Sequence, residues 1–167
     1  MTYSTGSLLA FALFVAAMTV GCERVEFAPL PDSGSVVELR IGDKAVQAEL
    51  ALDDVTRRQG LMYRTELPEN SGMLFGYDTS KELKFWMRNT EVPLSIAFLS
   101  DDGEILQIER MRPHDERHTL SKMDVRFALE MNQGWFEENG IGVGSRIGNF
   151  VEVTTNLPIR RENPSVR

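Results

Sequence analysis

The chain has 167 residues, a formal net charge of −7 and a hydrophobic content of 42%. These values are typical of one packed globular domain with additional segments, and they exclude a chain that is disordered throughout. Because an acidic domain is a poor match for a polyanion, we expect no nucleic-acid partner.

An apolar run from Leu8 to Val20 leads to Gly21 and the single cysteine, Cys22. The run is shorter than the roughly 20 residues that a membrane-spanning helix needs, and it suits the core of a signal peptide. A small residue before the cysteine resembles the lipobox of bacterial lipoproteins. We therefore expect a lipoprotein signal peptide at residues 1–21, a lipid on Cys22, and export to the cell envelope, on the periplasmic side of the outer or inner membrane. The alternatives are an uncleaved anchor and a cleaved signal with a free thiol.

The next segments alternate between loop-forming and periodic sequence. Residues 22–35 contain two prolines and a Ser-Gly-Ser sequence, which predicts a flexible tether. Apolar residues that alternate on both sides of a glycine turn predict a β-hairpin over 36–52. Asp53 to Gln59 predicts a short helix, because an aspartate can cap its free N–H groups and Gly60 can supply a left-handed exit.

The central third of the chain predicts strands. A buried strand is expected at 72–77. The stretch 84–98 alternates apolar and polar residues around turn-forming Asn, Thr and Pro, which predicts a strand, a turn and a strand. The Asp-Asp-Gly sequence at 101–103 predicts a tight turn that joins 94–100 to 104–110 as a hairpin.

Another strand and a second helix are expected after residue 124. Residues 125–131 alternate apolar and polar side chains and predict a half-buried strand. Residues 132–139 predict a short helix capped by Asn132, and 146–153 predict the last strand. Residues 154–167 contain two prolines and few apolar residues, which predicts a loose tail. Together these elements predict a mainly β fold: a small, single-domain barrel or sandwich of antiparallel strands with two short helices.

Three ordered sequence blocks carry a resemblance to a known family. They are Gly60-Leu61-Met62 with Arg64, Gly72-Met73-Leu74-Phe75, and Phe85-Trp86-Met87 followed by Asn89-Thr90 and Pro93-Leu94. On these blocks the chain, over about 36–153, resembles the bacterial and archaeal family Domain of Unknown Function 192. The resemblance implies a small, mainly β domain and no established reaction. Ser95 stands where the family has an acidic residue, which sets this chain apart from any role that needs that carboxylate.

Trp86 is the most informative candidate for binding. By alternation it shares a sheet face with Lys84 and Arg88. An aromatic ring between long polar side chains can form a platform for a flat ligand such as a sugar ring, and Asn89 and Arg64 could add hydrogen bonds. The alternative is that Trp86 packs as core, with Arg88 stacked on it. The candidate binding residues are Arg64, Trp86, Arg88, Asn89 and Glu130.

No catalytic or metal-binding motif stands out. His114 and His118 are spaced for a metal only on a helix, whereas Pro113 and many charges favour a loop. We therefore expect no metal and no cofactor. The preferred hypothesis is a non-catalytic, lipid-anchored envelope module that binds a small ligand, a glycan or an envelope protein. The alternative is an envelope hydrolase that acts on a polymer such as a glycan and uses Glu130, Ser95 or the histidines.

Overall fold

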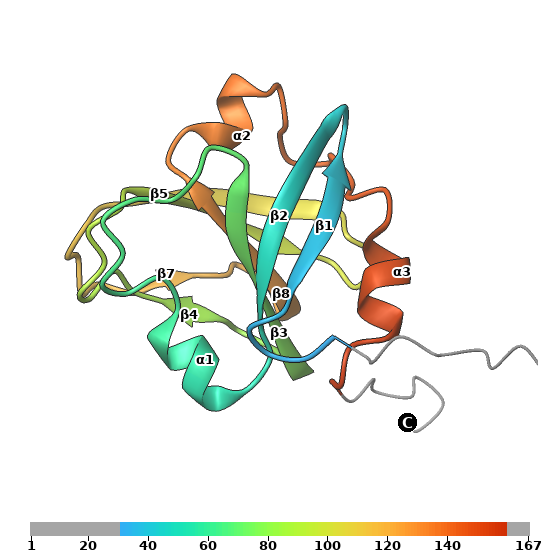
Figure 1. The fold of residues 1–167 in the computed structure, drawn as a ribbon, viewed down its shortest axis with the longest axis horizontal. Coiled ribbons are helices and arrows are strands. Elements are labelled where there is room, and N and C mark those ends of the chain that lie inside the picture. The colour runs from blue at the N-terminus through green and yellow to red at the C-terminus, as the bar shows by residue number, and fades with distance from the viewer. Residues whose placement is uncertain (1–30, 160–167) are drawn as a thin grey trace, which may run out of the picture.

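The computed structural model describes residues 31–159, which form a mainly β, sandwich-like domain (Figure 1). The predicted signal peptide, Cys22 and the first part of the tether lie outside the described residues, as does the end of the predicted tail. The described strands are β1 (Val36–Ile41), β2 (Lys44–Ala51), β3 (Ser71–Lys81), β4 (Lys84–Phe85), β5 (Leu94–Leu99), β6 (Ile105–Met111), β7 (Thr119–Leu120) and β8 (Val125–Asn132). The described helices are α1 (Asp54–Gln59), α2 (Trp135–Glu138) and α3 (Phe150–Thr155).

The strands form a larger sheet and a small one. The larger sheet has six strands in the order β1-β2-β3-β8-β5-β6, and β4 pairs with β7 in a separate two-stranded sheet. Both predicted hairpins, β1–β2 and β5–β6, are confirmed. The expectation of antiparallel strands throughout is wrong at one place, because β2 and β3 are parallel. The segment between them contains α1 and is long enough for the crossover that parallel strands require. Since β1 and β6 are the two edges, the described sheet is open and the barrel alternative is not realised.

The centre of the larger sheet, at β5 and β8, is buried on both faces. In β8, Phe127, Leu129 and Met131 face a first core beneath α2 and α3, whereas Ala128 and Glu130 face a second core. The second core lies under α1, the loop after it and the β4–β7 pair (Figure 1). The prediction that β8 is half-buried is therefore wrong. Alternation gives the two faces of a strand but does not say whether another layer covers the polar one.

The stretch 84–98 forms a strand, a turn and a strand, as predicted, but the two strands do not pair with each other. The first strand is only Lys84 and Phe85, which pair with Leu120 and Thr119 of β7 and not with β5. The chain then turns through Asn89, which has a φ of 55°. The backbone N–H of Met87 donates to the carbonyl oxygen of Asp115 at 2.8 Å, so the 112–118 loop holds this turn in place.

The predicted second helix is confirmed as the shorter α2, and a third helix forms where the sequence predicted a strand. The helix α2 begins after Gly134, and the side-chain amide of Asn132 donates instead to the carbonyl oxygens of Leu67 and Pro68. Of the predicted strand 146–153, only isolated antiparallel bridges form, between Arg146 and Glu104 and between Ile147 and Ile41, and α3 starts at Phe150. Phe150 and Thr154 are both buried one helical turn apart, so the 3.6-residue period decides the structure there.

The ends of the described chain pack on the domain. The hydroxyl of Ser33 accepts hydrogen bonds from the N–H groups of Leu52 and Asp53, so the last residues of the predicted tether are fixed. Leu157 and Ile159 are buried in the first core. The expectation of a loose tail is therefore wrong for residues 154–159.

Candidate functional site: a cavity over the second core

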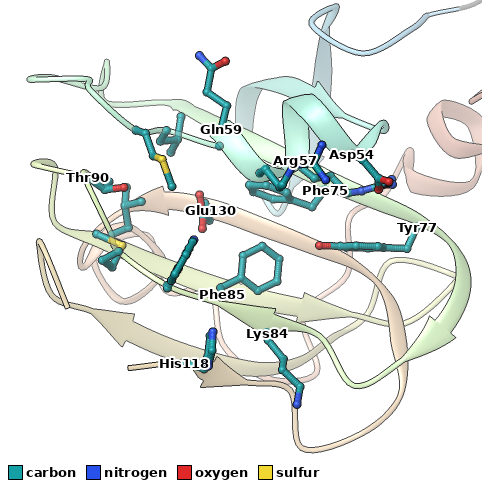
Figure 2. A pocket seen from close by; sticks show the side chains of 17 residues that line it. Asp54, Arg57, Gln59, Phe75, Tyr77, Lys84, Phe85, Thr90, His118 and Glu130 are labelled. Atoms are coloured by element: carbon teal, nitrogen blue, oxygen red, sulfur yellow. Dashed lines mark hydrogen bonds and ion pairs between the residues drawn. The ribbon is translucent and has the colours of Figure 1, made fainter. Parts of the chain in front are cut away.

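A cavity of about 280 Å³ opens between α1 and the β4–β7 sheet, above the second core. Figure 2 shows Asp54 and Arg57 of α1 on one side, Lys84 and His118 on the other, and Glu130 between them. About half of the lining residues are apolar or aromatic, namely Leu61, Met62, Phe75, Tyr77, Phe85, Trp86, Met87 and Leu94. Small-molecule sites in proteins share this combination of a concave apolar wall and a few polar groups.

The helix α1 owes its position to its amino-terminal cap. The carboxylate of Asp53 accepts hydrogen bonds from the N–H groups of Val55 and Thr56, which satisfies two of the free donors at the start of the helix. Hydrogen bonding with Ser33, and then with Thr56, holds the pKa of Asp53 well below its usual range. Gly60 ends the helix with a φ of 49°. The sequence prediction of this helix and both of its ends is confirmed.

Arg57 connects α1 to the sheet. One guanidinium nitrogen donates to the carbonyl oxygens of Leu52 and Gly76, at 2.5 and 2.7 Å, and the other pairs with Asp54. The guanidinium carbon also lies 4.7 Å from the centre of the Tyr77 ring. Burial raises the pKa of the Tyr77 phenol. Arg57 therefore serves as a structural clamp on the cavity wall, and its donors are engaged within the protein.

Glu130 is the unusual group of the cavity. It lies on β8 in the middle of the sheet, opposite Met73 of β3 and Ile96 of β5, and its exposed fraction is 4%. None of the residues 31–159 donates a hydrogen bond to its carboxyl group, whose oxygens are in contact with the cavity rather than sealed in the core. Burial raises the pKa of Glu130 to about 8. A carboxyl group without a partner in an apolar cavity is costly, and such groups mark functional sites.

Trp86 and His118 form part of the cavity mouth. Their rings are stacked, with centres 6.0 Å apart and planes 23° apart. The guanidinium carbon of Arg88 lies 5.6 Å from the centre of the Trp86 ring. The exposed fraction of Trp86 is 39%, so the alternative of complete core packing is wrong. Two polar neighbours, His118 and Arg88, nevertheless lie against its ring.

Three loops with strained backbone meet beside this mouth. Among the described residues, the non-glycine positions with positive φ are Tyr63, Asn89 and His114. The N–H of Tyr63 donates to the carbonyl oxygen of Asn89, and the N–H of His114 donates to that of Thr90, which lines the cavity. Positive φ in a non-glycine residue costs roughly 1–3 kcal/mol and is concentrated at functional sites. Its clustering here agrees with a site at the cavity.

The structure brings together two of the five candidate binding residues. Trp86 and Glu130 line the cavity, whereas Arg64, Arg88 and Asn89 do not. Arg64 forms a two-pronged ion pair with Glu49, which lowers the pKa of that carboxyl, mainly through the hydrogen bonds. The amide of Asn89 donates to the hydroxyl of Tyr63.

The groups considered for catalysis do not converge. Glu130 and His118 line the cavity, but Ser95 pairs with Met131 and therefore faces the first core, on the opposite side of the sheet from Glu130. Its hydroxyl accepts the N–H of Gly134 at the start of α2. Over residues 31–159, no three His, Asp, Glu or Cys side chains gather closely enough to hold a metal ion. Within the same range, no helix is sufficiently long and apolar to cross a membrane.

The sequence analysis did not predict the aromatic walls of the cavity. Phe75 and Tyr77 of β3 and Phe85 of β4 come from different parts of the sheet system, and Phe75 and Phe85 meet edge to face at 4.9 Å. Alternation in β3 would have placed Phe75 and Tyr77 on one face. No local signal indicates that β4 lies above them.

Comparisons with known proteins support the resemblance seen in the sequence. A solved structure from Sinorhizobium meliloti 1021, described as "a putative transcription regulator", is 35% identical with a TM-score of 0.62, over 65% of this chain and 88% of that one. A protein of unknown function from Novosphingobium aromaticivorans DSM 12444 is 32% identical with a TM-score of 0.64, over 71% and 89% of the two chains. A search of curated proteins gives no match. The family model DUF192, described as "Uncharacterized ACR", matches residues 37–148. The chain therefore belongs to the Domain of Unknown Function 192 family.

Proposed function

We propose that this protein is a non-catalytic binding module that takes a small ligand into the cavity above Glu130. The observation that carries the proposal is the carboxyl group of Glu130, which is buried, reaches the cavity and receives no hydrogen bond from residues 31–159. A ligand that supplies this hydrogen bond would gain affinity, because it satisfies a group that the folded protein leaves unsatisfied.

The size and lining of the cavity support a small, partly apolar ligand. Its volume of about 280 Å³ lies at the lower end of the range for small-molecule sites, which starts at roughly 300 Å³. The aromatic and methionine side chains of the wall suit a hydrocarbon body. The Trp86 face is a weaker candidate, because a sugar ring stacked there would compete with Arg88 and His118.

The chain contains its own reporter for binding. Trp86 lines the cavity, whereas the other tryptophan, Trp135, is buried in the first core on the opposite side of the sheet. A panel of amines, carboxylates, sugars and short peptides is titrated against the wild type and Trp86→Phe, by tryptophan fluorescence and by protein-observed NMR. A cavity ligand should change the wild-type fluorescence, leave the emission of Trp135 in the variant nearly constant, and shift NMR signals of cavity residues. If no compound shifts those signals, the binding proposal is wrong.

The proposed location is the cell envelope, with the domain held by a lipid on Cys22. The support is the short apolar run that ends at Gly21-Cys22. A multiply acylated cysteine would anchor stably, whereas one acyl chain is marginal. The test compares wild type and Cys22→Ser by palmitate labelling and membrane fractionation. Label on the wild type and release of the variant are expected; an unlabelled wild type, and a variant that stays in the membrane, would contradict the proposal.

A second candidate function is hydrolysis with Glu130 as general acid. The favouring observation is that burial raises the pKa of Glu130 to about 8, so the group holds a proton at neutral pH inside a cavity. Asp54 is the other carboxylate of the cavity, but it is paired with Arg57. Assays on chromogenic glycosides and esters with wild type and Glu130→Gln test this candidate. Turnover by the wild type that the variant abolishes would replace the binding proposal.

The regulator description of the Sinorhizobium protein finds no support in the acidic charge of this chain.

A further inference from the structure

We infer that the ligand of the Glu130 cavity is an organic ammonium ion, an amine with an apolar body whose N–H groups bind the Glu130 carboxylate. The inference rests on the proposed function, since it names the chemical class of the ligand that this cavity takes. Its basis is the combination of one buried acidic acceptor, aromatic rings in the wall, and lining donors on Arg57 and Thr90 that are engaged elsewhere.

The cavity presents an acceptor that receives no hydrogen bond from residues 31–159. Two donors of the lining are engaged elsewhere: Arg57 donates to Leu52, Gly76 and Asp54, and the hydroxyl of Thr90 donates to the carbonyl oxygen of Arg88. The Tyr77 hydroxyl is a neutral donor of the same lining. An ionised Glu130 therefore needs its hydrogen bonds from a ligand. A charged donor forms the strongest of these, roughly twice as strong as a neutral one.

The wall around Glu130 favours a cation over other charged groups. Phe75 and Phe85 line the cavity, and aromatic rings attract cations in desolvated sites. Protein cations already lie over the other two rings, Arg57 and Lys81 over Tyr77 and Arg88 over Trp86. An anion beside Glu130 would meet its carboxylate as a like charge. Lys84 is already paired with Glu82 at 3.0 Å, as Arg57 is with Asp54.

The charges around the mouth restrict the ligand further. The ionisable groups that line the cavity besides Glu130 are Asp54, Arg57 and Arg58 of α1, Tyr77 of β3, Lys84 of β4 and His118. These include three permanent cations and one carboxylate, so a second positive charge at the outer end of the ligand would be repelled. The inference is therefore a monoamine, with its ammonium group at Glu130 and a neutral or anionic end at the mouth.

Binding of such a ligand is coupled to the release of a proton. In the empty cavity the pKa of Glu130 is raised to about 8, so at pH 7 the group is mostly protonated. The ammonium ion pairs with the ionised form, and the proton of the carboxyl group leaves to solvent. Below pH 8 the dissociation constant should rise about tenfold for each pH unit, and it should be nearly constant between pH 8 and the pKa of the amine.

Three probes of equal length test the inference: hexylammonium, hexanol and hexanoate, titrated by calorimetry at pH 6.0, 7.0 and 8.5 in two buffers of different ionisation enthalpy. We expect hexylammonium to bind the wild type tightest, about 80-fold tighter at pH 8.5 than at pH 6.0, with close to one proton released at pH 7. Glu130→Gln keeps the shape of the side chain but has no charge. It should bind hexylammonium at least tenfold more weakly at pH 8.5, with no proton release. Arg64→Ala, outside the cavity, is the matched control and should behave as the wild type.

The outcomes separate the inference from the function on which it rests. If hexanol or hexanoate binds the wild type as tightly as hexylammonium at pH 8.5, or if amine binding releases no proton, the ammonium inference is wrong while the cavity remains a binding site. The same holds if none of the three binds but the broader panel yields a cavity ligand. If neither the probes nor the panel shift cavity signals, the binding proposal fails as well. The proton count in the wild type decides the question even if Glu130→Gln does not fold.

Discussion

Replacement of Glu130 by Gln should change how the stability of the protein depends on pH. In the unfolded chain the carboxyl group has its ordinary pKa of 4.5, whereas burial raises the folded-state pKa to about 8. Because the folded-state value is the higher one, the folded protein binds the proton more tightly. The stability associated with this proton is fully present below pH 4.5, and it is lost as the pH rises to about 8.

The size of the effect follows from the two pKa values. A pKa difference of one corresponds to about 1.4 kcal/mol, so the total loss above pH 8 is about 5 kcal/mol. Between pH 5 and pH 7 the wild type should lose roughly 2–3 kcal/mol of unfolding free energy through this group alone. Glutamine does not titrate, so Glu130→Gln lacks this contribution. The stability of the variant relative to the wild type should therefore rise by roughly 2–3 kcal/mol over the same range.

Urea unfolding at pH 5, 6, 7 and 8, followed by the emission of Trp135, measures this difference. Glu49→Gln is the matched control, because Glu49 lies in the same row of the sheet, next to Met73, but its pKa is lowered by Arg64. Its ionised form stabilises the folded state, so that variant should lose stability relative to the wild type above pH 4.5 and show no further change between pH 6 and 8. If the curves of wild type and Glu130→Gln run parallel from pH 5 to pH 8, the carboxyl group of Glu130 is not desolvated as described.

Further predictions concern the frame that holds the cavity. Gly103→Ala should cost at least 2 kcal/mol by thermal unfolding, since a Cβ atom would lie 2.5 Å from a phenylalanine side chain, whereas Gly144→Ala, with similar φ and open space, should cost only about 1 kcal/mol; equal losses would contradict the steric explanation. Ser95→Ala removes the acceptor of the Gly134 N–H and should destabilise the protein by about 1 kcal/mol in urea, while Ser95→Thr retains it. Arg64→Ala should cost less than about 1 kcal/mol, because its ion pair is partly exposed, and a loss of several kcal/mol would show that the pair is worth more than its exposure implies.

Local sequence determined those elements whose partners are close along the chain. The hairpin β1–β2 and the hairpin β5–β6 each close around a short glycine-containing turn, so alternation and turn chemistry were sufficient to predict them. The helix α1 was predicted with both ends, because Asp53 and Gly60 act on backbone groups within one turn. The family blocks are also local, and the resemblance that they carry is confirmed.

Tertiary structure decided every feature that depends on which strands pair and which layer packs on each face of the sheet. The parallel pairing of β2 with β3, and the pairing of β4 with β7 instead of β5, are long-range contacts that no local period encodes. The same holds for Glu130. Its place in an alternating strand predicts a polar face, and only the layer formed by α1 and β4–β7 turns that face into a cavity. Burial of the carboxyl group, and with it the raised pKa, arises from residues distant in sequence, because desolvation depends on the surroundings of a group and not on its neighbours along the chain.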